Sequence, residues 1–214
     1  MTAEEFIRVL REDYLDDLIP EYLWSNNALL RYLNEAIYEA NARSHLLHDE
    51  VIVPIKAGIA NYKLNCCVRD IDEIKINGEC PLIPTTQAAL DSHYGCCWRS
   101  SVSKPAKYFR ADDVFTLYPT PLEDSVATVK YWKNPEPLDF SSDLPFHGVS
   151  LDKLYFWCAY RASLKADQDT LSEQLGMRYL ADFEQFFGKS KSALMQRMEK
   201  NFPANAKVIP QRIV

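Results

Sequence analysis

The 214-residue chain is long enough for one large domain or two small ones. Hydrophobic residues make up 47% and charged residues 25%, which is ordinary for a globular protein that buries a sizeable core. The formal net charge of −6 disfavours a protein that coats nucleic acid, because such coats need a basic surface to displace counterions. The sequence has no basic and apolar leader, and no apolar run approaches the roughly 20 residues that span a bilayer, so we expect folding in a cytoplasm.

The first fifty residues have helical periodicity. A capping box formed by Thr2 and Glu5 predicts that the first helix starts at residue 2, and Pro20 predicts its end. Ser25 is expected to cap a second, long helix that is apolar on one face. The stripe on that face consists of Leu29, Leu33, Ala36, Ile37 and Ala40.

After residue 50 the apolar pattern changes to that of strands. Segment 51–55 is β-branched, and Asn77-Gly78 predicts a hairpin turn between 74–76 and 79–82, because both turn residues tolerate positive φ. Segments 107–110 and 114–118 predict a second hairpin, and 126–132 predicts a final strand. Residues 85–91 fit either a short helix or a loop. An antiparallel sheet or small sandwich over 51–133 is expected.

The C-terminal part returns to helical periodicity. Segment 135–150 is rich in Pro, Ser and Asp and predicts an extended linker, after which Ser150 is expected to cap a third helix. Thr170 and Glu173 fit a second capping box, and Gly188 marks a break or kink. From residue 203 the chain has two prolines and no helical period, so this tail is expected to be extended or disordered unless a partner orders it.

Together these segments predict an α+β fold, in which a β-rich region is inserted into a helical scaffold. Residues 1–50 and 150–202 would form a helical bundle from the N- and C-terminal segments. Residues 51–149 would form the antiparallel β-rich insertion and linker, and residues 203–214 an extended C-terminal tail.

The six cysteines do not have the spacing of a zinc site. They are Cys66, Cys67, Cys80, Cys96, Cys97 and Cys158. Zinc ligands usually have two residues between them, whereas the two vicinal pairs here would diverge on a strand. Without a secretion signal, disulfides are disfavoured. We therefore expect free, mostly buried thiols; a zinc site built from the two vicinal pairs, or a disulfide, is the alternative.

Other candidate residues for chemistry have simple structural interpretations. His45 and His48 lie three apart near the end of the second helix and could share one face, but no third ligand is evident. Asp112-Asp113 is interpreted as a turn and Asp16-Asp17 as a solvated helix end. The sequence has no hydrolase elbow, P-loop or dinucleotide fingerprint. It therefore predicts no catalytic, cofactor-binding or metal-binding residue, and no enzyme.

Three consecutive aromatic residues, Tyr155, Phe156 and Trp157, cannot all face one core from a helix. At least one is predicted to meet a neighbouring subunit, because aromatic side chains concentrate in interfaces. A helix that is buried on most sides is the alternative.

Three blocks of the sequence resemble tailed-phage head-to-tail adaptor proteins, also called connector or neck proteins. The first is 24–44, which contains Leu29-Leu30, the run YLNEA and the run ARS. The second is the run LYPTP at 117–121 with the strand 126–132, Pro135 and Pro137-Leu138. The third is the run DLPFH at 143–147, followed by Leu151, Leu154 and the run YRA. The resemblance covers residues 24–165.

This resemblance implies a structural protein without catalysis or cofactor, located in the virion neck and assembled in the host cytoplasm. It would form a ring, expected to be dodecameric, that docks on the portal protein, extends the DNA channel and attaches tail or nozzle proteins. Double-stranded DNA would pass without sequence-specific binding and no membrane would be involved. An acidic ring suits this role, because it repels the DNA backbone. The alternatives are another virion ring, such as a stopper or tail-completion protein, and a metal-binding intracellular enzyme.

Adaptor tails commonly reach into the portal, so the resemblance assigns portal binding to the C-terminal residues. These are Lys207, Val208, Ile209, Pro210, Gln211, Arg212, Ile213 and Val214. Such a short segment cannot bury a core alone and would fold on binding.

Overall fold

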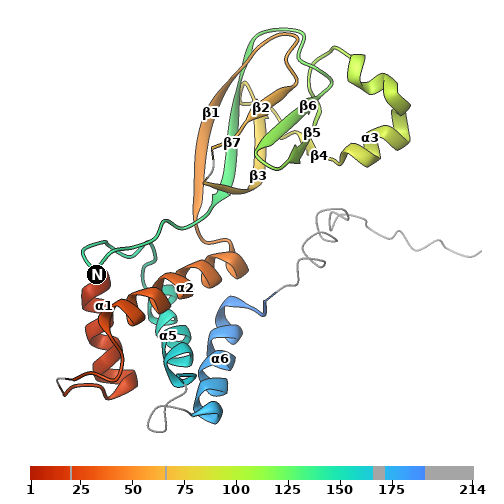
Figure 1. Ribbon diagram of the computed structural model, residues 1–214. Coiled ribbons are helices and arrows are strands. Elements are labelled where there is room, and N and C mark those ends of the chain that lie inside the picture. Colours follow the sequence, from red (N-terminus) through yellow and green to blue (C-terminus); the bar gives the residue numbers. More distant parts are fainter. Residues whose placement is uncertain (20, 66, 166–171, 191–214) are drawn as a thin grey trace, which may run out of the picture. The chain divides into compact units, whose positions relative to one another are not determined.

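The computed structural model describes residues 1–19, 21–65, 67–165 and 172–190 (Figure 1). The described chain divides into a helical unit, residues 1–47 and 133–190, and a β unit, residues 48–132. Helices and antiparallel strands are both present, which confirms the predicted mixture of the two.

The first helix begins as predicted. In α1 (Ala3–Val9) the Thr2 hydroxyl accepts the Glu5 N–H at 3.2 Å, and the Glu5 carboxylate accepts the Thr2 N–H at 2.9 Å. The helix continues as a π-helical turn, Leu10–Leu15, and then stops, because Asp16 adopts a left-handed conformation with φ 49°. The predicted end at Pro20 is therefore wrong: the helix ends before the proline is reached.

Helix α2 (Asn26–Ser44) matches its prediction closely. The Ser25 hydroxyl accepts the Ala28 N–H at 3.2 Å, and the whole predicted stripe is buried. His45, with φ 52°, ends the helix in the left-handed conformation.

The C-terminal helices are α4 (Val149–Asp152), α5 (Leu154–Ser163) and α6 (Glu173–Phe187). Helix α4 is capped by Gly148 at φ 59° rather than by Ser150, because glycine adopts positive φ without strain. Gly188, with φ 86°, ends α6, so the predicted break is a helix terminus. The Thr170–Glu173 capping box involves Thr170, which lies outside the described residues.

Helices α2 and α6 both pack against α5, which lies at the centre of the helical core. The largest fully buried side chains of this core are Phe6, Leu10, Leu29, Leu33, Ile37, Leu154 and Phe183. Segment 133–148 has no helix or long strand, as expected of a linker, but it packs on the helices. Its Leu144 and Phe146 are buried in the helical core, and the Ala3 N–H donates to the Ser142 carbonyl at 2.9 Å.

The β unit contains two sheets (Figure 1). The three-stranded sheet has the order β1-β7-β3, formed by β1 (His48–Ile55), β7 (Ser125–Lys133) and β3 (Val68–Ile76). The four-stranded sheet has the order β2-β6-β5-β4, formed by β2 (Asn61–Lys63), β6 (Val114–Tyr118), β5 (Lys107–Ala111) and β4 (Ile83–Pro84). Both sheets contribute to one apolar core, which contains Ile55, Ile74 and Phe115.

The predicted hairpin at 107–118 is confirmed as the antiparallel pair β5–β6. The turn at Asn77-Gly78 also forms, with φ values of 49° and 74°. Residues 79–82 are nevertheless not a strand, and the neighbour of β3 in its sheet is β7. Strand β4 instead pairs in parallel with β5, so one pair departs from the predicted antiparallel order.

Residues 85–91, which fit a helix or a loop, lie mostly in helix α3 (Gln87–Tyr94), capped by the Thr86 hydroxyl. A 3₁₀ helix, Gly95–Ser100, follows. Leu90 and Trp98 pack with two residues of the four-stranded sheet, Phe109 and Tyr118, in a small second core.

A buried carboxamide near the end of α2 joins the two chain segments that lead to and from the β unit. The Asn41 Nδ2 donates to the Lys133 carbonyl at 2.8 Å, and its Oδ1 accepts the Leu47 N–H at 2.9 Å. The Lys133 N–H in turn donates to the Leu47 carbonyl at 3.0 Å. Asn41 has no exposed surface, whereas Leu47 and Lys133 are partly buried, so the side chain links the two segments from inside the helical unit.

We expect Asn41→Ala to lower the free energy of unfolding of the helical unit by roughly 1–3 kcal/mol, because it removes the hydrogen-bond partner of a partly buried carbonyl and of a partly buried N–H. Urea unfolding followed by the helical circular-dichroism signal measures this. Asn27→Ala, on the exposed first turn of the same helix, is the control and should change the stability by less than about 0.5 kcal/mol. Equal effects of the two substitutions would contradict the role given to Asn41.

Candidate interaction surfaces

The residues considered for metal binding are not brought together. His45 caps α2, whereas His48 lies on β1 beside Trp132, with ring centroids 6.3 Å apart. The idea that the two histidines share a helix face is wrong, because the helix ends at Ser44. Among the described residues no group of three or more His, Cys, Asp or Glu side chains could hold a metal ion. Asp112 and Asp113 form the β5–β6 turn, as predicted.

The cysteines are less buried than predicted. Cys80, Cys96, Cys97 and Cys158 are free thiols, as expected, but the described cysteines are not mostly buried: Cys80, Cys96 and Cys97 are exposed and Cys67 is partly exposed. Only Cys158, on α5, is buried, and burial raises the pKa of its thiol far above the ordinary value. Cys80 follows the Asn77-Gly78 turn, and Cys96 and Cys97 lie in the 3₁₀ helix. The local sequence pattern does not reveal that these segments are exposed to solvent.

The three consecutive aromatic residues on α5 lie in three different environments. Tyr155 is only 4% exposed and stacks between Phe6 at 4.0 Å and Tyr14 at 5.0 Å, so it belongs to the chain's own core. Burial raises the pKa of its hydroxyl well above the usual range. Phe156 and Trp157 are half-buried and line two different hollows.

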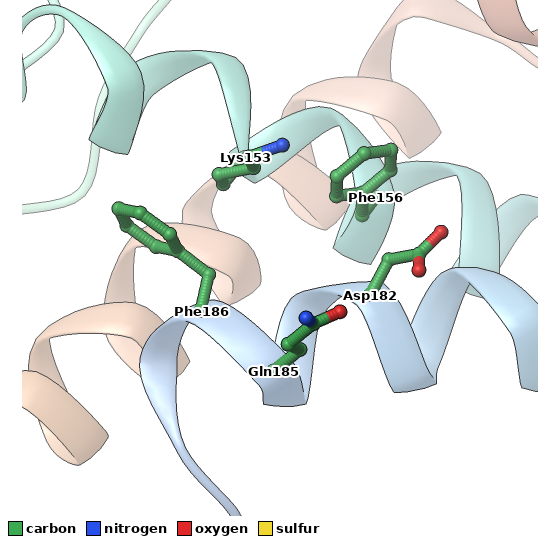
Figure 2. Close-up of a pocket in the computed structure, with 5 residues that line it drawn as sticks. All are labelled: Lys153, Phe156, Asp182, Gln185 and Phe186. Carbon is green, nitrogen blue, oxygen red and sulfur yellow. The ribbon is translucent and has the colours of Figure 1, made fainter.

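Phe156 lines a hollow of about 400 Å³ between α5 and α6, shown in Figure 2. The lining residues are Lys153, Phe156, Asp182, Gln185 and Phe186. The Lys153 Nζ lies 4.8 Å from the centroid of the Phe156 ring, and Phe186 is 44% exposed. The hollow is therefore aromatic inside and charged at its rim, which suits an apolar side chain flanked by a charge.

Trp157 lines a more polar hollow between α2 and α5. There the Arg161 Nε lies 3.0 Å from the Glu35 Oε2, and the Arg43 guanidinium lies 5.3 Å from the Trp157 ring. Of the charged residues that line it, Glu35, Glu39 and Arg161 already form ion pairs within the chain.

A buried ion pair organises the loop between α1 and α2. Arg11, on the π-helical turn, is bound to the Asp17 carboxylate, and it also donates to the Trp24 carbonyl and to the Asn26 Oδ1. The other Asp17 oxygen accepts the Leu23 N–H at 3.0 Å. Asp17 is only 5% exposed, so the predicted solvated helix end is wrong for Asp17, though right for the exposed Asp16. The pairing was missed because a six-residue separation is not a side-chain contact on a regular α-helix.

Four large apolar side chains next to this ion pair in the sequence are exposed. Leu18 is 56% exposed, Ile19 80%, Tyr22 47% and Leu23 42%. We call these four residues the apolar knob. Single exposed apolar side chains are common, but four of them in one short loop make that loop a candidate interaction site.

The C-terminal residues assigned to portal binding, 207–214, lie outside the described part of the chain. None of the described helices is both long and apolar enough to cross a membrane.

Across the described residues, the features that stand out are exposed apolar side chains and two hollows beside α5. The family model of the SU10 adaptor protein matches residues 1–207, and the chain belongs to this family of phage structural adaptors. The match confirms the adaptor resemblance seen in residues 24–165. No curated protein matches the sequence.

We expect Asp17→Asn to lower the free energy of unfolding by about 3 kcal/mol, because the Arg11 guanidinium stays buried without its counter-charge. Asp16→Asn is the matched control. Asp16 is exposed, and asparagine tolerates its left-handed conformation, so the change should stay within about 0.5 kcal/mol. Chemical denaturation of both variants measures the difference. A stability loss that is the same in both would show that the ion pair does not organise the loop.

Alkylation of the native protein should modify Cys80, Cys96 and Cys97 first, Cys67 more slowly, and Cys158 only after unfolding. The reactive species is the thiolate, and burial with a raised pKa suppresses it at Cys158. Peptide mass spectrometry after timed exposure to iodoacetamide measures the order. Protection of Cys80, Cys96 and Cys97 that a chelator removes would instead favour the zinc alternative.

Proposed function

We propose that this protein is a head-to-tail adaptor of a tailed phage that forms a ring, expected to be dodecameric, on the portal. The ring extends the DNA channel and offers the attachment site for tail or nozzle proteins. The observation that carries the proposal is the family match over residues 1–207. The protein acts in the virion neck after assembly in the host cytoplasm, and its partners are the portal, tail proteins and further copies of itself.

The charge of the chain supports passage of DNA rather than its retention. The net charge of −6 per copy is multiplied by the number of subunits in a ring, and a negative ring repels the phosphate backbone. Double-stranded DNA is therefore proposed to pass without sequence-specific contacts. No enzymatic step is part of this function.

We assign portal docking to residues 207–214. This segment combines two cations, Lys207 and Arg212, with the apolar residues Val208, Ile209, Ile213 and Val214. The family match ends at residue 207, so the assignment is supported by the resemblance to adaptor tails and by the composition of the segment. A short segment with this composition gains order from a partner surface rather than from its own core.

Removal of residues 207–214 is expected to abolish co-sedimentation with purified portal rings, while the helical circular-dichroism signal stays unchanged. A full-length variant with the same eight residues in shuffled order is the control for length and charge, and should bind as weakly as the truncated chain. Docking by the truncated chain that equals docking by the intact chain would refute the tail assignment.

The adaptor function itself is tested by quantitative mass spectrometry of purified virus particles. The expected result is a copy number equal to that of the portal protein. Absence of the protein from particles would refute the proposed function, and a copy number that matches a different virion ring would favour a stopper or tail-completion role.

A further inference from the structure

We propose that the apolar knob of one copy docks into the α5/α6 hollow of the next copy, and that this head-to-tail contact builds the ring. The inference rests on the proposed function, because it names the surfaces through which adaptor copies would meet. The two surfaces are different, both belong to the helical unit, and both lie within the described residues.

Contacts with the buried ion pair hold both ends of the apolar knob. Its first residue follows the buried Asp17, and the Leu23 N–H at its other end donates to the same carboxylate. The Arg11 guanidinium lies 4.1 Å from the centroid of the Tyr22 ring. This contact fixes the position of the Tyr22 side chain. Burying an ion pair is often no more stabilising than apolar packing would be, but it does define one geometry. Here that geometry leaves Leu18 and Ile19 exposed to solvent.

The α5/α6 hollow has aromatic side chains that complement the apolar knob. Figure 2 shows the side chains of Lys153 and Phe156 on one side, and those of Asp182, Gln185 and Phe186, all from α6, on the other. Phe156 and Phe186 provide two aromatic surfaces on which branched aliphatic side chains such as Ile19 can pack. The volume of about 400 Å³ is large enough for side chains and too small for a folded domain.

The two surfaces lie at opposite ends of α5. At its C-terminal end, the Trp24 Nε1 donates to the Ala162 carbonyl at 3.2 Å, and Lys165 donates to the Leu23 carbonyl, which places the knob there. At its N-terminal end, Lys153 and Phe156 line the hollow. The ten residues of α5 separate these ends by about 15 Å. A projecting and a recessed surface at opposite ends of one element form a head-to-tail contact, and such contacts generate rings when the rotation closes.

The charges agree with this pairing and disfavour a symmetric one. Glu21 is exposed in the knob loop and Lys153 lies at the hollow, and neither has an ion-pair partner among the described residues. A two-fold contact of knob against knob would instead bring the Glu21 carboxylates of both copies together, which is repulsive.

The contact is tested by photocrosslinking of the full-length protein at its highest soluble concentration. The variant Ile19→p-benzoylphenylalanine is mixed with isotope-labelled chains so that crosslinks between copies can be recognised by mass. We expect intermolecular crosslinks to the 153–156 and 182–186 segments. The same crosslinker at Ile52, which is 66% exposed in the β unit, is the control and should not reach these segments.

Charge reversal separates a specific contact from chance encounters. Glu21→Lys and Lys153→Glu are each expected to lower the yield of this crosslink by about tenfold, because each brings like charges together. The double variant, Glu21→Lys with Lys153→Glu, restores the opposite pair and should recover most of the wild-type yield.

Crosslinks that fall on other segments, including residues 191–214, or only within one chain, would overturn the proposal. So would an absence of intermolecular crosslinks, or a double variant that is no better than the single variants. These outcomes leave the adaptor function standing if the particle copy number still matches that of the portal. A protein that is absent from particles but still gives the knob crosslink would refute the function and retain the contact.

Discussion

The packing of the helical unit depends on the hydrogen bonds that the Asn41 carboxamide makes. This carboxamide is buried near the end of α2, where it accepts a hydrogen bond from the segment that leaves for the β unit and donates one to the segment that returns. A buried backbone group must find a partner, and an amide side chain carries a donor on one atom and an acceptor on another, so it can bond two backbone groups at once. Asn34, on the same helix, bonds both backbone groups of Leu138 in the same manner. Two amides therefore attach the returning chain to α2.

Helix α5 organises the helical unit because its sequence is apolar on more than one side. Tyr155 and Cys158 lie in the core, whereas Phe156 and Trp157 lie at hollows beside α6 and α2. Because α5 is buried on several sides, little of its surface remains for contacts with other molecules. The apolar knob lies at one end and the α5/α6 hollow at the other. The function proposed here needs such a division, since a ring subunit must meet two neighbours through different surfaces.

Local signals in the sequence predicted local structure well. Thr2 with Glu5, and Ser25, cap the helices that they were expected to cap, and the Asn77-Gly78 turn adopts the expected positive φ values. Some of the predictions that were wrong depended on distant partners. Residues 79–82 were expected to pair with β3, but the neighbour of β3 is β7, a strand some fifty positions later in the sequence. The cap at Ser150 was displaced to Gly148 for a local reason, because glycine accepts a conformation that serine enters only with strain.

The sequence by itself determined the order of helical, β-rich and helical segments, the absence of known nucleotide-binding and hydrolase motifs, and the resemblance to adaptors. These follow from periodicity, composition and motif order, which are properties of neighbouring residues. Only the tertiary structure decided that Arg11 and Asp17 form a buried pair, that four apolar residues stand exposed beside it, and that α5 and α6 leave a hollow. Those features depend on which side chains remain uncovered after packing, and burial is a property of the whole fold rather than of any segment.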